Sequence, residues 1–383
     1  MFALLSLLIL SRAEGSAPDL WYGIDPESFR RLLPPIYILP LAEHIKPKAV
    51  DADFKLENEH SHDVLFLSWL LNDYEQTTRD GGSAKFFFLP AHNPTTKPYK
   101  DAKSDVWWRD VDRELEKIAE SGAMRSFALD KVLFASSFPI SVKRFITASF
   151  RNIADVRTIR VDNDLTMNGR DVFVPYILNP LIWSFNYSDT SKSKQQKKFF
   201  LAAICREAGG FLDAERIWRT KLYNQWRTVE NSMVVYSVAK PVFQHAFTNS
   251  DFCVILPGDT GSTAKLYMAI FSGCIPVVFV SFKKVLPFVH FLDWTLFSVP
   301  VLKDIINSKA AMRQLLSYLN VIRNNPSRLE RYKVSLASVA HLFDFGKRNW
   351  PSVYHLTMLE FARDYKLKSQ RNEGSSDLGN YLL

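Results

Sequence analysis

Short apolar runs alternate with segments of helical periodicity from Pro35 to Tyr365, and few folds accommodate that rhythm. Each run has the length of a strand, and the intervening segments are long enough to be helices that connect parallel strands. Because most of the runs are apolar throughout, the strands are expected to be buried between layers of helices. We therefore expect an α/β protein with parallel sheets that carry helices on both faces.

The chain has 383 residues, which is longer than a single hydrophobic core usually grows. Aromatic and aliphatic residues become rare in the stretch NYSDTSKSKQQKK, as in a linker, and the alternation starts again at KKFFLAAIC. We therefore predict two domains. The predicted boundaries are an apolar leader at 1–17, a first domain at 35–187, a linker at 188–198, a second domain at 199–366 and a disordered tail at 367–383.

The charge balance is basic, with 48 Lys and Arg against 40 Asp and Glu and a net charge of +8. A basic protein favours anionic partners, but most of these side chains are scattered, as on a solvated surface. The chain lacks the interleaved aromatic and basic motifs of RNA-binding domains, so we predict no nucleic-acid partner.

The N-terminus begins with an apolar run, MFALLSLLIL, followed by small residues. The run is too short to cross a bilayer, which takes about 20 apolar residues. We interpret it as a signal peptide, cleaved after Ala13 or Ala17, or as the remnant of a signal anchor. A buried N-terminal strand stays open as an alternative, because no Lys or Arg precedes the run.

Three cysteines, Cys205, Cys253 and Cys274, are too few for a disulfide-built scaffold and lack metal-ligand spacing. Cys253 and Cys274 each lie at the start of an apolar strand-like run. We expect buried thiols there. A disulfide between these two residues is the alternative in an oxidising compartment.

The stretch LPGDTGSTAKLYMAIFSGCIPVVF predicts a strand, a loop, a helix and a second strand. Gly258 and Gly261 let the backbone approach a ligand closely, and the free N–H groups at the helix start attract anions. Ser262 or Thr263 could cap the helix, and Lys265 adds a positive charge. The glycine spacing fits neither a dinucleotide fingerprint nor a P-loop, so an unrelated Rossmann-type enzyme and a purely structural turn both stay open.

The C-terminal half resembles the signature of the exostosin-like glycosyltransferases in two consecutive stretches, SDFCVILPGDTGSTAKLYMAIFSGCIPVVF and LPFVHFLDWTLFSVPV. Two upstream segments, RDGGSAKFFFLPAH and GRDVFVPY, are similar to further stretches of that family. The resemblance implies a GT-B glycosyltransferase fold, with two Rossmann-like domains facing across a cleft. It places the acceptor on the first domain and the nucleotide sugar on the second.

The resemblance also implies an activity and a compartment. Its members move a sugar from a UDP-sugar to a hydroxyl of a glycan or glycoprotein, invert the anomeric centre, and generally need no metal or other cofactor. They are proteins of the Golgi lumen, held by a type II anchor or delivered by a signal peptide. A homodimer, or a heterodimer with a related glycosyltransferase, is consistent with the resemblance.

By position, the resemblance assigns the nucleotide-sugar site to a loop and to two basic positions nearer the N-terminus. The assigned residues are Gly258, Asp259, Gly261, Ser262, Thr263, Lys265, Met268, Arg206 and Arg219. As the sugar leaves, negative charge develops on the diphosphate, and fixed N–H dipoles and cations stabilise it. Without a metal ion, the transfer would depend on those cations.

The sequence departs from the family pattern at three places. Lys265 replaces an arginine, which keeps the charge but loses bidentate contact with a phosphate. Met268 stands where family members usually carry an acid, and it cannot accept hydrogen bonds from ribose hydroxyls. The family's HD stretch falls at Ser136, Ser137 and Phe138, where no acid or base is present. A catalytically inactive partner subunit or glycan-binding scaffold therefore stays open.

An inverting transfer needs a carboxylate or imidazole that deprotonates the acceptor hydroxyl. Our candidate base is His92, directly after the strand FFFLPA, and Asp105 is the alternative, with Asp110 beside it in the same segment. A structural histidine and solvated aspartates are the open alternatives. The neighbouring pair Trp107 and Trp108 could stack on acceptor sugars or fill the core.

Overall fold

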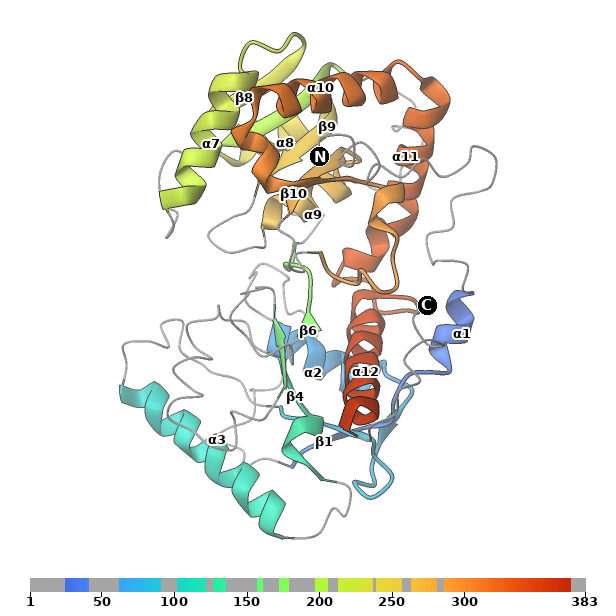
Figure 1. The fold of residues 1–383 in the computed structure, drawn as a ribbon. Coiled ribbons are helices and arrows are strands. Elements are labelled where there is room, and N and C mark those ends of the chain that lie inside the picture. The colour runs from blue at the N-terminus through green and yellow to red at the C-terminus, as the bar shows by residue number, and fades with distance from the viewer. Residues whose placement is uncertain are drawn as a thin grey trace.

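The computed structural model of the chain describes residues 25–40, 62–90, 102–121, 127–135, 157–160, 172–178, 197–205, 213–236, 239–256, 263–280 and 286–372. These residues form two lobes, each built on one parallel sheet (Figure 1). The predicted α/β class and the two Rossmann-like lobes of a GT-B fold are confirmed. The domain boundaries stay predictions, because most of the expected linker lies outside the described residues.

The first lobe contains a six-stranded sheet of order β2-β1-β3-β4-β5-β6, in which every neighbouring pair is parallel. Its strands are β1 (Ile36–Ile38), β2 (Thr77–Thr78), β3 (Phe86–Phe88), β4 (Val132–Ala135), β5 (Arg157–Arg160) and β6 (Val172–Phe173). The helical elements of this lobe are α1 (Pro26–Arg30), α2 (His62–Asn72), α3 (Ala102–Glu120) and the 3-10 turn η1 (Leu129–Lys131). The apolar runs predicted as strands here form β1, β3, β4, β5 and β6.

The second lobe contains a five-stranded parallel sheet of order β8-β7-β9-β10-β11. Its strands are β7 (Phe199–Cys205), β8 (Ser232–Tyr236), β9 (Ser250–Ile255), β10 (Ile275–Val280) and β11 (Val299–Leu302). Its helices are α7 (Asp213–Trp226), α8 (Lys240–Thr248), α9 (Ala264–Phe271), α10 (Lys309–Arg323) and α11 (Pro326–Ala340). Three 3-10 turns complete the set: η2 (Trp294–Leu296), η3 (Lys303–Asn307) and η4 (His341–Phe343).

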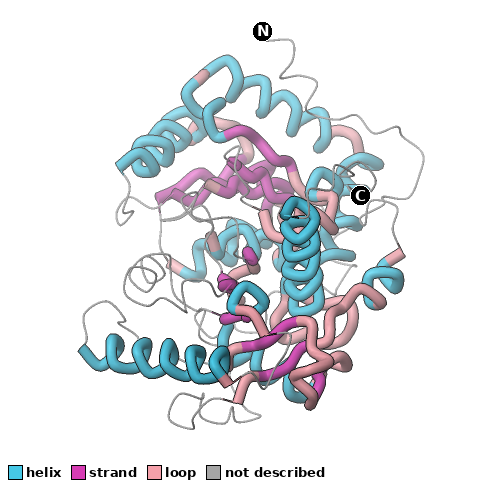
Figure 2. Tube along the Cα trace, turned by 60° about the horizontal axis from the view of Figure 1, so that its bottom comes forward, coloured by secondary structure: helices cyan, strands magenta, loops and turns pink. Residues whose placement is uncertain are grey.

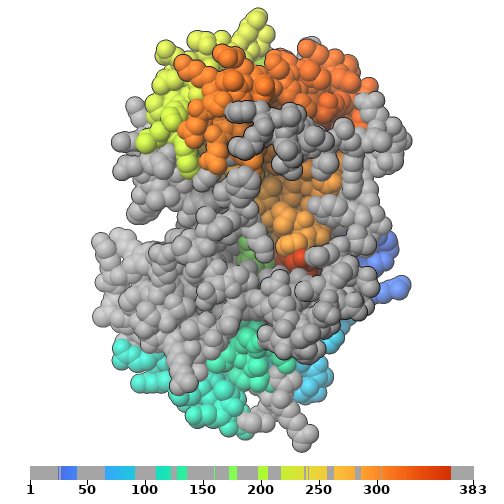
Figure 3. Space-filling view, in the orientation of Figure 1, coloured from blue at the N-terminus to red at the C-terminus, as the bar shows by residue number. Residues whose placement is uncertain are grey.

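Helices cover both faces of the second sheet (Figure 2). Side chains of β7 alternate between the two faces, as the period of two in a strand requires. Ala202 and Ile204 join the core cluster that contains α8 and α9, whereas Leu201 and Ala203 join the cluster that contains α7 and α10. The space-filling view places α3 and α10 at opposite ends of the molecule (Figure 3).

A disulfide joins Cys253 in β9 to Cys274, the residue before β10. The expectation of two buried thiols was therefore wrong. Residues 252 and 275 are paired across the ladder, and this register brings the two cysteine Cα atoms to 5.7 Å, within the range that a disulfide spans. The remaining cysteine, Cys205, is buried with a free thiol.

The last helix, α12 (Val353–Asn372), leaves the second lobe and packs on the first (Figure 1). The ring of Tyr354 stacks on Trp69 of α2 at 5.1 Å, and Phe361 meets Phe86 of β3 at 4.5 Å. The last segment of helical periodicity in the sequence, which ends at Tyr365, therefore forms a helix. The helix continues into the segment predicted as a disordered tail.

The amino ends of the second sheet hold a buried ion cluster. Asp251 in β9 lies 3.0 Å from Lys333 Nζ and 3.2 Å from Arg323 Nε, and its side chain is 3% exposed. Lys333 Nζ and Asp251 Oδ1 form an ion pair, but the angle between the two groups does not suit a hydrogen bond. Burial and the positive charge of Lys333 lower the pKa of Lys197 to about 8, and the negative charge of Asp251 acts in the opposite direction. The cluster joins α10 and α11 to the sheet.

In the described part of the chain, no helix is both long enough and apolar enough to cross a membrane.

Candidate functional site

The strand order of the second lobe locates its binding crevice. Counted from β7, the order is 2-1-3-4-5, so the chain leaves β7 toward one side of the sheet and later returns on the other side as β9. In open parallel sheets of this kind, ligands bind beyond the carboxyl ends of the two strands at this reversal. The crevice is therefore expected beyond Cys205 of β7 and Ile255 of β9.

The start of α9 lies at this crevice, just after the loop that follows β9. Thr263 caps the helix, and its hydroxyl accepts a hydrogen bond from the Lys265 backbone N–H at 3.4 Å. The cap is the one that the sequence predicted as an alternative to Ser262. A helix start presents a partial positive charge and free N–H groups, which favour an anion.

Lys265 brings a full charge to the end of β7. Its Nζ donates a hydrogen bond to the Ile204 carbonyl at 2.9 Å and lies 5.5 Å from the centre of the Phe243 ring in α8. The side chain is half-buried, so its charge is partly shielded from water. The ammonium group is therefore held at the carboxyl end of β7, where the strand order predicts the ligand.

Helix α7 brings the backbone of Arg219 to the same strand end, on the other face of the sheet. Arg219 is 7% exposed, and its carbonyl accepts a hydrogen bond from the Cys205 thiol, with 3.6 Å between sulfur and oxygen. Burial raises the pKa of Cys205 to about 11, while the charges of Lys265 and Arg219 act in the opposite direction. Lys265 and Arg219 are thus the two cations whose charges act on the thiol at this strand end.

Several predicted residues lie outside the described residues. They are His92, Arg206, Gly258, Asp259, Gly261 and Ser262, together with the Ser136–Phe138 stretch. Arg206 is the next residue after Cys205, and the described chain stops at Leu256 and resumes at Thr263 on the two sides of the predicted loop. Their assignments stay predictions.

Met268 is in α9, but its side chain packs in the protein core at 4% exposure. An acidic side chain at this position would lie among apolar neighbours. The structure thus gives a local packing reason for methionine here, and its assignment to the ribose side of the site stays a prediction.

The predicted acceptor-side acids lie on α3. The side chains of Asp105, Trp107 and Trp108 are outside the described residues, whereas Asp110 is partly exposed and lies 3.5 Å from Arg113 in an ion pair one turn away. This ion pair is consistent with the interpretation of a solvated helix face. The described residues contain no group of three or more metal-ligating side chains, which leaves the expectation of metal independence untested.

Sequence analysis did not identify Cys205 or Phe243 as neighbours of the site. The position of Cys205 was visible as the last residue of an apolar run, directly before the predicted Arg206. The place of Phe243 depends on how α8 packs beside β7, and no local pattern in the sequence carries that information.

Residues 33–316 match the Exostosin GT47 domain. Two similar proteins from Arabidopsis thaliana are the probable glycosyltransferase At5g03795, 29% identical over 27% of this chain and 22% of its own, and the probable arabinosyltransferase ARAD1, 25% identical over 52% and 44%. A third, the probable glycosyltransferase At3g07620, is 33% identical over 22% of this chain and 18% of its own. The chain thus matches less than half the length of these relatives.

Among solved structures, sucrose-phosphate synthase from Thermosynechococcus elongatus aligns with 81% of this chain and 72% of its own, at 11% identity and a TM-score of 0.30. A GtfA/B complex aligns with 70% and 61%, at 10% identity and a TM-score of 0.29.

Proposed function

The chain belongs to the Exostosin GT47 family of glycosyltransferases, and from that premise we propose that it transfers a sugar from a UDP-sugar to a hydroxyl of a glycan or glycoprotein, with inversion and without a metal. The observation that carries the proposal is the Lys265 ammonium group at the end of β7, beside the start of α9, with α7 holding Arg219 at the same strand end. This is the end of the sheet at which an α/β protein binds its ligand.

The chemistry explains why cations would be needed there. When the bond between sugar and UDP breaks, negative charge develops on the diphosphate. Lys265, Arg219 and the N–H groups at the start of α9 would stabilise that charge without having to reorganise. The base that deprotonates the acceptor would have to lie on the first lobe, and His92 remains our candidate.

A non-catalytic role, as a partner subunit or glycan-binding scaffold, is the second candidate. The sequence motivates it, because Met268 replaces the acid that family members usually carry at this position. This candidate predicts a folded protein that transfers no sugar from any donor.

We also propose the Golgi lumen as the compartment. The disulfide between Cys253 and Cys274 supports it, since disulfides form and persist in oxidising compartments. The apolar N-terminal run of the sequence is consistent with this route. Dimerisation with a related glycosyltransferase is a further part of the proposal and is testable by the mass of the purified protein in solution.

Calorimetric titration with UDP, with and without EDTA, tests the donor site. We expect binding that EDTA leaves unchanged. In Lys265→Met, the affinity should fall about 10-fold or more, because a hydrogen bond to a charged group contributes about 1.5–3 kcal/mol. Lys221→Met is the matched control, since Lys221 is an exposed lysine that pairs with Asn307. Equal UDP affinity in Lys265→Met and the wild type would place the diphosphate elsewhere.

A screen of UDP-sugars then separates the enzyme from the scaffold. Release of UDP in the presence of a glycan acceptor, lost in Lys265→Met and kept in Lys221→Met, supports the enzyme. UDP binding without release from any donor supports the scaffold.

A further inference from the structure

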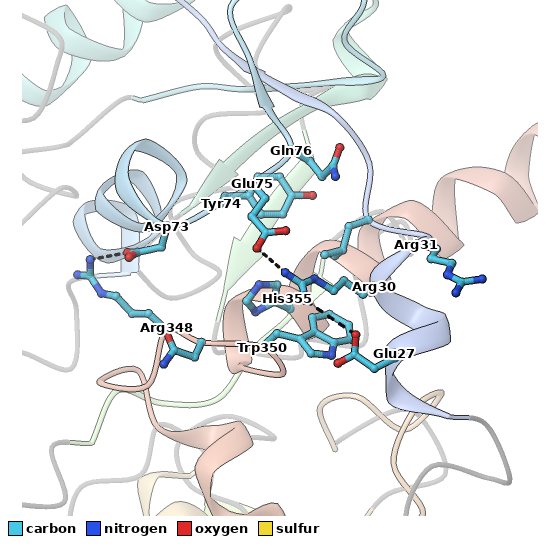
Figure 4. A pocket seen from close by; sticks show the side chains of 12 residues that line it. Glu27, Arg30, Arg31, Asp73, Tyr74, Glu75, Gln76, Arg348, Trp350 and His355 are labelled. Carbon is cyan, nitrogen blue, oxygen red and sulfur yellow. Dashed lines mark hydrogen bonds and ion pairs between the residues drawn. The ribbon is translucent and has the colours of Figure 1, made fainter.

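A cavity of about 610 Å³ lies between α1, the turn after α2 and the segment that leads into α12 (Figure 4). Its lining comes from chain segments far apart in sequence: Glu27, Arg30, Arg31, Leu33, Asp73, Tyr74, Glu75, Gln76, Arg348, Asn349, Trp350 and His355. Helix α1, which contributes to the lining, also contacts the second lobe, since the ring of Phe29 lies 5.2 Å from that of Phe291. None of its lining residues belongs to β7, β9 or α9, and it is therefore separate from the proposed donor site.

Aromatic side chains form one wall of the cavity. Trp350 and His355 meet edge to face at 5.0 Å, and His355 meets Trp69 in the same way at 4.9 Å. The Ser352 hydroxyl lies 2.7 Å from His355 Nδ1 and fixes the ring. The indole N–H of Trp350 is buried and has no hydrogen-bond partner among the described residues. This wall is thus rigid and apolar, with one donor left to satisfy.

The charged side chains on the rim, apart from Arg31, are paired with one another. Arg30 contacts Glu75, and its Nη1 lies 3.8 Å from Glu27 (Figure 4). Arg348 donates to Asp73 at 2.9 Å and to the Ser68 hydroxyl at 3.2 Å.

The rim carries three arginines and three carboxylates, which gives no net charge. An anionic ligand would meet as much repulsion as attraction here, so the charge balance favours a neutral ligand.

Three further lining side chains are available to a ligand. Within the described part of the chain, Arg31, Gln76 and Asn349 have no side-chain hydrogen bond or ion pair. Gln76 and Asn349 each offer amide donors and an acceptor, which suits groups that both donate and accept hydrogen bonds. The two amides therefore give the cavity neutral, unused hydrogen-bonding capacity next to its aromatic wall, and Arg31 adds one donor group that is unpaired among the described residues.

We propose that this cavity binds a neutral sugar unit of a glycan, as a second carbohydrate site that is separate from the donor site. A sugar ring presents C–H faces that pack on aromatic rings, and hydroxyls that both donate and accept, so it matches the wall and the rim together. The volume is within the range of about 300–1,000 Å³ for small-ligand pockets. The proposal rests on the proposed function, which supplies the acceptor glycan that this site would hold.

The test titrates the full chain with neutral hexasaccharides of β-1,4-linked glucose, β-1,4-linked xylose and α-1,5-linked arabinose, and with anionic hexagalacturonate. We expect saturable binding of at least one neutral hexasaccharide. Its affinity should fall about 10-fold in Trp350→Leu, because an aromatic anchor typically contributes more than about 1 kcal/mol. Gln76→Ala combined with Asn349→Ala should weaken it about 5-fold, since each lost hydrogen bond is worth about 0.5–1.5 kcal/mol.

Asn324→Ala is the matched control for the amide variants, because Asn324 is exposed at the end of α10, far from the cavity. The amide variants also control for misfolding, since no hydrogen bond or ion pair within the described part of the chain depends on those side chains. Absence of neutral hexasaccharide binding, equal binding in all variants, or tighter binding of hexagalacturonate would overturn the proposal.

UDP titration of the same variants separates this proposal from the proposed function. Glycan binding that depends on Trp350, in a chain that binds no UDP, would support the glycan site in the cavity and contradict the proposed transferase function. UDP binding that depends on Lys265, with glycan binding unaffected by Trp350→Leu, would support the transferase function and contradict the glycan site.

Discussion

Acid should destabilise this protein through His355, in the first turn of α12. The side chain is 7% exposed and lies between the rings of Trp69 and Trp350. Burial, and to a lesser degree the charge of Arg30, lowers the pKa of His355 from 6.5 to about 4. The imidazole is therefore neutral in the folded protein at neutral pH.

The sign of the effect follows from the lowered pKa. Between pH 6.5 and about 4, the unfolded chain binds a proton at His355 that the folded chain does not bind. The free energy of unfolding therefore falls as the pH falls through this window. At about 1.36 kcal/mol per pKa unit, the loss approaches about 3.4 kcal/mol below the window and reaches about 2.5 kcal/mol at about pH 4.5.

Urea unfolding at several values between about pH 7.5 and about pH 4.5 measures this loss, with His355→Phe as the comparison. The variant leaves the buried Ser352 hydroxyl without its partner, which costs about 1–3 kcal/mol at every pH. Carboxylates that titrate in the same range contribute equally to both proteins. The wild type should therefore lose about 2.5 kcal/mol more than the variant over this range. Parallel pH profiles would refute the argument.

Three further tests concern the core of the second lobe and use chemical unfolding. Asp251→Asn should lower the free energy of unfolding by about 3–5 kcal/mol because it leaves Lys333 buried without its carboxylate, and adding Lys333→Met should recover part of the loss. A loss below about 1 kcal/mol would contradict the buried pair. Replacing Cys253 and Cys274 together by alanine should cost about 3 kcal/mol for a 21-residue separation, and reductant should weaken the wild type but not the variant. Met268→Glu should destabilise the protein by at least about 2 kcal/mol at neutral pH, and unchanged stability would mean that this position opens to water.

The strands of the second lobe could be predicted from sequence because each is a compact apolar run. The runs FFLAAIC, FCVI and IPVVFV form β7, most of β9 and β10, with helices between them as the alternation requires. Helix α11 was not predicted, although Asn325 caps it and Pro326 opens it, which is a recognisable helix start. The sequence predicted buried thiols, with the disulfide only as the alternative. Disulfide formation depends on the register between β9 and β10, which a single sequence does not specify.

The candidate site could be predicted in part. The resemblance assigned Arg219 and Lys265 to one ligand, and the structure brings both to the end of β7, from opposite faces of one sheet. The cavity at Trp350 could not be predicted. Its lining joins residues near positions 30, 75 and 350, and no local pattern reports contacts at such a separation.

The position of α12 also has a consequence for biosynthesis. The hydrophobic core of the first lobe is completed by Tyr354 and Phe361, which the ribosome makes after every strand of both sheets. Until they emerge, Trp69 and Phe86 lack aromatic neighbours that cover them in the finished protein. The first lobe is translated first but closes its core last, so the nascent chain exposes an apolar surface through most of its synthesis and offers chaperones a site to bind.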